Sequence, residues 1–229
     1  MLRIDQQRGG LAEQVPRDHA VHHLQHRRQQ LGPRGQQQAQ GDGVTRDAQG
    51  PRVGAVGHSA GGYTVLALAG GQPDVSRIAK HCGFDQADDP IFCQSSRTGQ
   101  AAAPSATPAT TAVPLTDPRV RAVVALAPLG AVFSARSLAA IRVPVALYAA
   151  EKDRWLVPRF HADWIAQNLP TARIHRVPNA WHFAFMDAPS MPIPTADGDI
   201  GADPEGFDRA AYLKWLSREL PAFFDGALR

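Results

Sequence analysis

The tightest constraint on this chain is the pentapeptide Gly-His-Ser-Ala-Gly at residues 57–61, together with its flanks. A short apolar run at 53–56 precedes it, and an apolar segment rich in alanine and leucine follows at 63–69. This order predicts a strand, a tight turn and a helix. A serine at the centre of such a turn lies on strained backbone. We expect side chains at positions 57 and 61 to collide with the neighbouring strand or helix.

The predicted turn raises the Ser59 hydroxyl above the sheet edge, where it can act as a nucleophile. It also places the backbone N–H of Ala60 at a helix N-terminus, where that group can face a developing oxyanion. A bare Gly-x-Ser-x-Gly match is a weak signal, because glycine and serine are common turn residues. The alternative is an ordinary turn serine. A catalytic serine is favoured if an acid and then a histidine follow it along the chain.

The rest of the chain after this turn alternates strand-like and helix-like segments. Continuous apolar runs predict buried strands at 119–128 and 143–150, and a further strand is predicted at 172–177. A short helix is predicted at 134–141, where Ser134 is a plausible N-cap, and helical spacing predicts helices at 158–168 and 207–224. The alternation predicts an α/β fold, with a mainly parallel sheet and flanking helices. Active sites of such sheets lie beyond the carboxyl ends of the strands.

Three reactive side chains fall just after the ends of predicted strands: Ser59, Asp153 and His182. Their order along the chain is that of the α/β hydrolases. We expect His182 to take the proton of the Ser59 hydroxyl and Asp153 to hold the imidazole. Glu151 in the same loop is the alternative acid. His58 is expected to pack, with its side chain directed away from the Ser59 hydroxyl.

The aromatic side chains beside the acid and the base are Trp155, Trp181 and Phe183. They can form apolar walls for the acyl or alcohol part of a substrate, or they can be ordinary core and rim residues. Three other histidines carry no signal beyond local polarity: His81, His161 and His175.

Residues 71–118 interrupt the pattern with six prolines and an Ala/Thr/Ser/Pro tract at 101–112. They predict a surface excursion with short helical pieces at most. Cys82 and Cys93 lie inside it, and either a disulfide or two reduced thiols is consistent with the sequence. We favour the disulfide, because so few apolar residues otherwise hold this segment. Such a bond requires an oxidising compartment.

Residues 1–50 differ from the rest, being rich in glutamine and arginine and without Phe, Trp, Tyr, Lys or Cys. One interpretation of this composition is a leader that is disordered or weakly helical. The other is that residues 1–50 are not the sequence that originally preceded the domain at 51–229. Four histidines lie close together there, but they lack acidic or thiolate companions, so no metal site is expected: His19, His22, His23 and His26.

The composition excludes several functional classes. A net charge of +3, with basic residues scattered, does not indicate nucleic-acid binding. No run of 18 apolar residues exists, so no membrane span is expected, and no signal peptide is visible.

From residue 51 onward the chain resembles the α/β-hydrolase superfamily, and within it the dienelactone-hydrolase-like serine hydrolases. Four segments carry the resemblance: VGAVGHSAGG, RVRAVVALAP, VPVALYAAEKD and VPNAWHFAF. The resemblance implies Ser59 as nucleophile, Asp153 as acid and His182 as base. It also implies activity on a small carboxylic ester without a cofactor. Members of this branch are often exported, which fits a Cys82–Cys93 disulfide and a periplasmic or secreted location.

The chain departs from this family in two respects. Dienelactone hydrolases proper use a cysteine nucleophile, so lactone specificity does not carry over to Ser59. Several strands precede the turn in the family, and a loop after one of them supplies a second oxyanion N–H. Residues 1–50 contain no such pattern, so we expect an exposed strand edge and weakened activity. The alternatives to an ester hydrolase are a truncated, inactive remnant and an acyltransferase on the same scaffold.

Overall fold

The computed structural model describes residues 52–101, 115–195, 198–199 and 201–229. The predictions for residues 1–50, including the absence of the family's preceding strands, therefore lie outside the described residues. So does most of the Ala/Thr/Ser/Pro tract.

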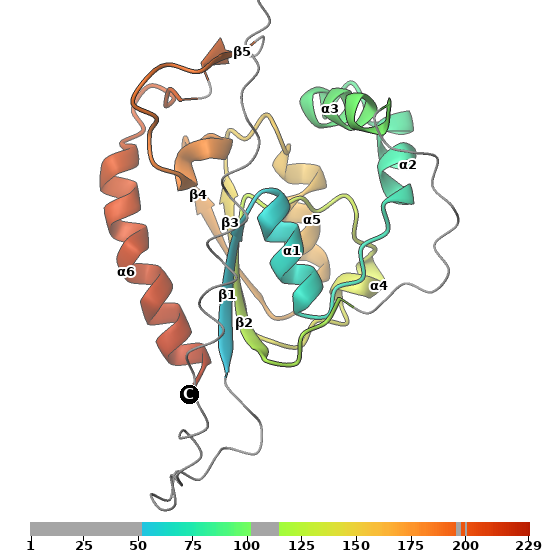
Figure 1. Ribbon diagram of the computed structural model, residues 1–229, viewed down its shortest axis with the longest axis vertical. Helices are drawn as coiled ribbons and strands as arrows, with labels where there is room; N and C mark the ends of the chain where they lie inside the picture. Colours follow the sequence, from blue (N-terminus) through green and yellow to red (C-terminus); the bar gives the residue numbers. More distant parts are fainter. Residues whose placement is uncertain (1–51, 102–114, 196–197, 200) are drawn as a thin grey trace, which may run out of the picture. The chain divides into compact units, whose positions relative to one another are not determined.

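Four parallel strands form the central sheet (Figure 1), in the order β1 (Val53–His58), β2 (Val120–Leu126), β3 (Val145–Ala150) and β4 (Ala172–Val177). Val56 lies opposite Val124, which in turn lies opposite Ala146. The predicted α/β class with a parallel sheet is confirmed at this level. The carboxyl ends of all four strands share one edge, because the strands are parallel.

Helices cover both faces of the sheet, and the alternation of side chains along each strand explains why. Val123 and Ala125 of β2 face a core shared with one group of helices, whereas Val124 and Leu126 face a core shared with another. The first group consists of α1 (Ala60–Leu68), α4 (Ala135–Leu138) and α5 (Ala162–Asn168), and the opposite face is covered by α6 (Arg209–Ala227). Both faces of the two central strands, β2 and β3, are thus buried, as their continuous apolar sequences require, whereas most residues of β1 and β4 are partly or fully exposed.

The helix predicted at 158–168 is divided into a single 3₁₀ turn, η1 (Pro158–Phe160), and α5. The break falls at His161, whose backbone is not helical (φ −120°, ψ −90°). The side chain of His161 is fully buried, and its ring accepts a hydrogen bond from the backbone N–H of Gly130 (3.1 Å). Sequence periodicity could not reveal this interruption, because its cause is a contact with a distant loop.

The prediction of short helical pieces at most within 71–118 is wrong for the first half of that segment. Two helices occupy it, α2 (Ser76–Phe84) and α3 (Pro90–Ala101). The predicted disulfide between Cys82 and Cys93 is confirmed, and it joins the two helices. The two half-cystines pack with Phe92, Ala131 and Leu156 in a small separate core, which gives the helices an apolar anchor. A few well-placed residues therefore hold a segment that is polar on average.

The described part of the proline-rich segment 187–206 is mostly irregular. It follows a 3₁₀ turn, η2 (His182–Phe185), and contains a short antiparallel pair, β5 (Pro194–Thr195) and β6 (Gly198–Asp199).

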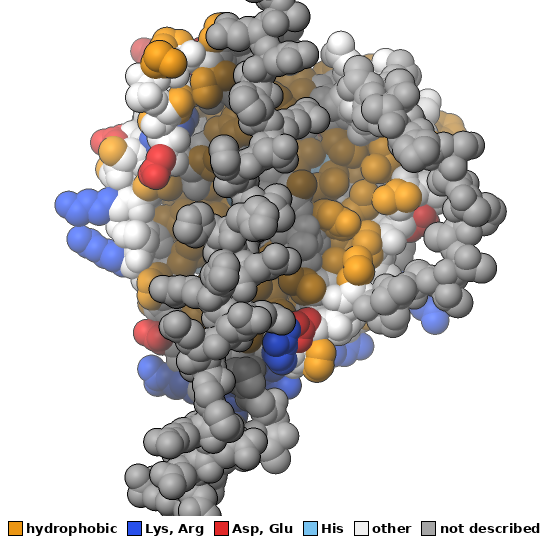
Figure 2. All heavy atoms as spheres, in the orientation of Figure 1, with side chains coloured by type: hydrophobic (Ala, Val, Ile, Leu, Met, Phe, Trp, Pro, Cys, Tyr) orange, Lys and Arg blue, Asp and Glu red, His pale blue; other side chains and the backbone are white. Residues whose placement is uncertain are grey.

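In the part of the chain that the structure describes, β1 pairs with β2 alone. Val56 at its centre is 51% exposed, in contrast to the fully buried Val124 opposite it. Figure 2, drawn in the orientation of Figure 1, shows hydrophobic side chains gathered around α1, with Lys and Arg side chains mostly toward the margins of the view. Among the described helices, none combines the length and the apolar character needed to cross a membrane.

Candidate active site

The turn between β1 and α1 places Ser59 on strained backbone, with φ 56° and ψ −117°. A Cβ at Gly57 would lie 2.1 Å from the carbonyl oxygen of Gly61, so only glycine fits at position 57. The expected collision at Gly61 is wrong, because a Cβ there would meet nothing within 4 Å. The second glycine of this turn at which a side chain would collide is Gly62, where a Cβ would lie 2.7 Å from the Cβ of Pro128. Close packing of α1 on the loop after β2 therefore depends on Gly62.

The structure brings the three predicted residues together at the carboxyl edge of the sheet. Nε2 of His182 lies 2.9 Å from Oγ of Ser59, and Nδ1 of His182 lies 2.7 Å from Oδ2 of Asp153. Asp153 is 5% exposed and His182 is 3% exposed. In a buried site this carboxylate keeps the Nδ1 proton facing it and leaves Nε2 as the acceptor for the serine proton.

The carboxylate of Asp153 is held in place by its own loop. Its Oδ1 accepts hydrogen bonds from the backbone N–H groups of Trp155 and Leu156, both at 2.9 Å. The alternative acid, Glu151, is exposed and accepts a hydrogen bond from the backbone N–H of Asn179 instead (2.9 Å). Of the two candidate acids, the one in contact with His182 is Asp153.

His58 contacts both the backbone and the ring of His182. Its Nε2 donates to the backbone carbonyl of His182 (2.8 Å), and the two rings lie 4.7 Å apart. Burial lowers the pKa of His58 below its ordinary value, and the neighbouring His182 ring lowers it further. His58 is therefore a neutral donor that fixes the backbone of His182, in line with the expectation that it packs.

In the described part of the chain, the backbone after Ser59 leaves the N–H of Ala60 open at the start of α1. The carbonyl of Ser59 accepts from Tyr63 and Leu129, and its own N–H donates to Leu126. Within the described residues, no hydrogen bond occupies the N–H of Ala60, the first residue of α1. This donor points from the positive end of a nine-residue helix, where a negative charge is favoured.

Two of the three predicted wall residues lie beside the histidine. The ring of Trp155 stacks on that of His182 at 6.2 Å, and Phe183 meets Trp155 edge-on at 5.2 Å. Trp181 is placed differently, because the guanidinium of Arg154 covers its ring at 4.4 Å. Trp155 and Phe183 are thus the aromatic residues in position to limit access to the triad.

Sequence reasoning missed a second cluster of ionisable side chains. Asp89 is fully buried in the turn between α2 and α3, and its Oδ2 accepts from Nε2 of His81 and Nε2 of His161, each at 2.8 Å. Its Oδ1 faces the N–H of Val157 in the loop that follows Asp153 (3.4 Å). No local pattern could have revealed this cluster, because His81 and His161 are 8 and 72 residues from Asp89.

The two histidines of this cluster have little freedom to act as bases or ligands. Nδ1 of His161 accepts from the N–H of Gly130, so its proton must lie on Nε2, facing Asp89. Burial lowers the pKa of His161, which keeps this ring neutral, although Asp89 opposes the shift. Burial acts to raise the pKa of Asp89, but hydrogen bonds from His161 and His81 outweigh it and hold that pKa below its usual range.

The same geometry bears on metal binding. Ligand atoms of His81, Asp89 and His161 lie within 4.8 Å of one another. A cation at Nε2 of His161 would displace its proton while Nδ1 still accepts a backbone N–H, which demands an imidazolate. In a second grouping, His81 with Cys82 and Cys93, both sulfurs are already committed to the disulfide. Both groups are better suited to holding α2 and α3 in place than to holding a metal.

Comparison with known proteins adds no family to this geometry: no protein-family model matches the chain, and no curated protein matches it significantly.

Proposed function

We propose that this protein is a serine hydrolase of the α/β-hydrolase type that cleaves a small carboxylic ester through an acyl-enzyme. The observation that carries the proposal is the continuous hydrogen-bonded chain from Ser59 through His182 to Asp153. The strained backbone at Ser59 supports it as well, because such strain is characteristic of nucleophile turns. The resemblance to dienelactone-hydrolase-like enzymes belongs to the same proposal.

In the proposed reaction, Nε2 of His182 takes the proton of Ser59 as Oγ attacks the ester carbonyl carbon. Negative charge on the carbonyl oxygen is met by the N–H of Ala60. His182 then gives its proton to the departing alkoxide, which leaves an acyl group on Ser59. Water repeats the sequence, releasing the carboxylic acid and restoring the serine.

The surroundings suit an uncharged substrate with a modest apolar part. Trp155 and Phe183 would contact the acyl or alcohol group beside His182. The Cys82–Cys93 disulfide supports an oxidising, periplasmic or secreted location.

A fluorophosphonate label tests the proposal, because it reacts only with an activated serine. We expect the wild-type chain to be labelled and to hydrolyse p-nitrophenyl acetate, and Ser59→Ala to lose both. Ser217→Ala, which removes an exposed serine hydroxyl from α6, is the control and should be labelled like the wild type. A folded wild-type chain that takes no label would support the inactive remnant. Transfer of the acyl group to an added alcohol in preference to water would support the acyltransferase.

A further inference from the structure

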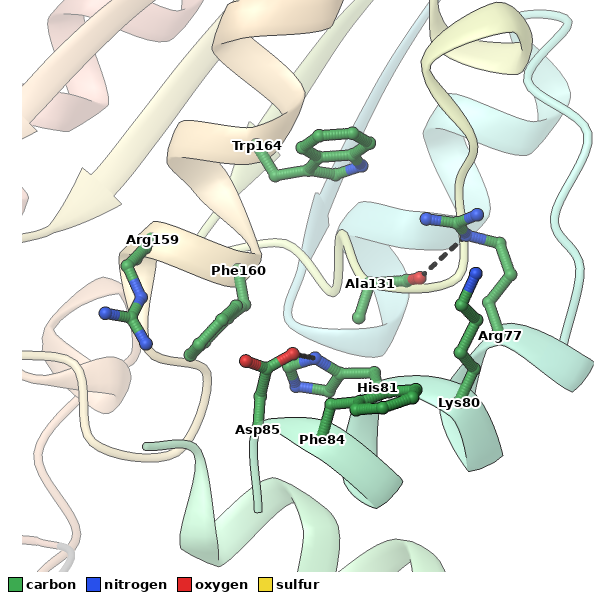
Figure 3. Close-up of a pocket in the computed structure, with 9 residues that line it drawn as sticks. All are labelled: Arg77, Lys80, His81, Phe84, Asp85, Ala131, Arg159, Phe160 and Trp164. Atoms are coloured by element: carbon green, nitrogen blue, oxygen red, sulfur yellow. Dashed lines mark hydrogen bonds and ion pairs between the residues drawn. The ribbon is translucent and has the colours of Figure 1, made fainter. Parts of the chain in front are cut away.

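A second concave site lies away from the triad. A pocket of about 260 Å³ opens between α2 and the η1–α5 segment, and no member of the triad lines it. One wall comes from α2, with Arg77, Lys80 and Phe84, and the other from η1 and α5, with Phe160 and Trp164. Figure 3 shows side chains of both walls converging on the same space.

Basic side chains outnumber acidic ones in the lining of the pocket, with Arg77, Lys80 and Arg159 against Asp85, and the nearby carboxylate of Asp74 also interacts with Arg77. Nε of Arg77 donates to the carbonyl of Ala131 (3.2 Å), which orients the guanidinium and leaves its terminal nitrogens available. Lys80 lies one turn further along the same helix, and no ion pair is formed by it within the described chain. The carboxylate of Asp85 is engaged with Nδ1 of His81 (3.3 Å). Arg159 at the rim pairs with Asp88 outside the pocket (2.9 Å).

Aromatic side chains supply the other part of the lining. Phe84 is 83% exposed, which is unusual for a phenylalanine and leaves its ring faces uncovered at the pocket. Phe160 lies on the opposite wall, where the guanidinium of Arg159 covers its ring at 4.2 Å and the ring of His81 meets it edge-on at 4.7 Å. Trp164 completes that wall and has its own N–H satisfied by the carbonyl of Phe133 (2.9 Å). The ring left open to an apolar, planar group is therefore that of Phe84.

The two walls are fixed relative to each other by buried contacts. The disulfide ties α2 to α3, and Asp89 at the start of α3 joins His81 of one wall to His161 at the junction of η1 and α5. A site whose walls are already in place loses less conformational entropy when a ligand enters.

We propose that this pocket binds a small aromatic carboxylate, with the carboxylate between Arg77 and Lys80 and the ring against Phe84. Guanidinium groups bind carboxylates through paired hydrogen bonds, and aromatic rings favour offset or edge contacts with one another. The volume lies just below the range of about 300–1,000 Å³ that is typical for drug-sized ligands, so a single ring fits. This site does not depend on the chemistry of Ser59.

Titration of the ¹⁵N-labelled protein with benzoate tests the proposal, with chemical shifts of α2 and α5 as the readout. We expect a dissociation constant on the order of 1 mM, because the site is open and its ion pairs are screened by water. Arg77→Ala combined with Lys80→Ala should weaken binding by about tenfold or more. The matched control combines Arg218→Ala with Lys214→Ala, which removes two exposed charges from α6 and should leave binding unchanged.

Two further variants separate the parts of the proposal. Phe84→Ala should weaken benzoate binding by several-fold while leaving the weaker binding of acetate unaltered, because only benzoate uses the ring. Ser59→Ala should bind benzoate as the wild type does, so a failure of the proposed ester hydrolysis would not affect this result. Acetate binding as tight as that of benzoate, or benzoate binding that survives the loss of Arg77 and Lys80, would overturn the proposal.

Discussion

Two buried aspartate–histidine pairs in this protein have the same chemical composition and different third partners. In the pair Asp153–His182, the histidine nitrogen that faces away from the carboxylate meets the Ser59 hydroxyl. In the pair Asp89–His161, the corresponding nitrogen accepts the backbone N–H of Gly130. The two carboxylate–imidazole distances differ by little, at 2.7 Å and 2.8 Å.

The two pairs show that the role of a histidine depends on the partner of the ring nitrogen that does not face the carboxylate. A lone pair that faces a hydroxyl can receive its proton, which is the role of general base that the proposed reaction gives to His182. A lone pair that already accepts an N–H is occupied, so His161 can only donate to Asp89 and hold two loops together.

Asp153→Asn should lower kcat for an ester by about 10⁴-fold. The oxygen of the new amide would remain with the N–H groups of Trp155 and Leu156, so its NH₂ would face Nδ1 of His182. The imidazole proton would then move to Nε2, and Ser59 would have no base. The measurement is kcat with p-nitrophenyl acetate, with circular dichroism to verify the fold. Retention of kcat within tenfold would contradict the proposed role of Asp153.

Removing the disulfide by the double change Cys82→Ser and Cys93→Ser should lower the free energy of unfolding by about 2–3 kcal/mol, because only a short loop is closed. Chemical denaturation measures the change. A reducing agent should shift the wild-type midpoint toward that of the variant and leave the variant unchanged. Equal midpoints of wild type and variant would show that Asp89 and its histidines hold α2 and α3 without the bond.

Asp89→Asn repeats the substitution of Asp153 in the second pair, and it should affect stability instead of chemistry. The loss of the carboxylate charge weakens the hydrogen bonds from His81 and His161, so the free energy of unfolding should fall by about 2 kcal/mol. We expect kcat to remain within about tenfold of the wild type. Chemical denaturation and ester turnover, measured on the same preparations, test both statements. A large loss of kcat in a variant of unchanged stability would contradict a purely structural role of Asp89.

Stability should fall as the pH drops below about 6.5, where unfolded histidine takes up protons. His58 and His161 have lowered pKa values in the folded protein, chiefly because they are buried, so the unfolded state binds more protons in this window. Each such group contributes at most about 1.4 kcal/mol per pH unit. Denaturation midpoints at several pH values give the slope. His58→Gln, which can still donate to the carbonyl of His182, should reduce the slope, and an unchanged slope would assign the effect to other groups.

The placement of Ser59, Asp153 and His182 at one edge could be predicted because each follows a recognisable strand segment. Parallel strands bring their carboxyl ends to one edge, so placement follows from topology without any knowledge of side-chain contacts. The crowded glycine could not be identified in the same way. Gly61 was expected to collide and Gly62 does so, because the clash is with Pro128, which lies on a different loop.

The helices α2 and α3 were missed for a related reason. Their sequence has many polar residues, and the apolar anchors that stabilise them, such as Phe92, find their partners in Ala131 and Leu156 far along the chain. Their disulfide was expected, since two cysteines in a segment poor in apolar residues have few other uses.

The sequence alone therefore predicted the α/β class with a parallel sheet and named the three residues that meet at its edge, because strand patterns and residue order are local or one-dimensional information. It left His81 and His161 without a role, and it gave no sign that Arg77, Phe84 and Phe160 line one pocket. Those relations exist only in the folded chain. A histidine becomes a base or a structural donor according to the atom that tertiary packing places against its second nitrogen.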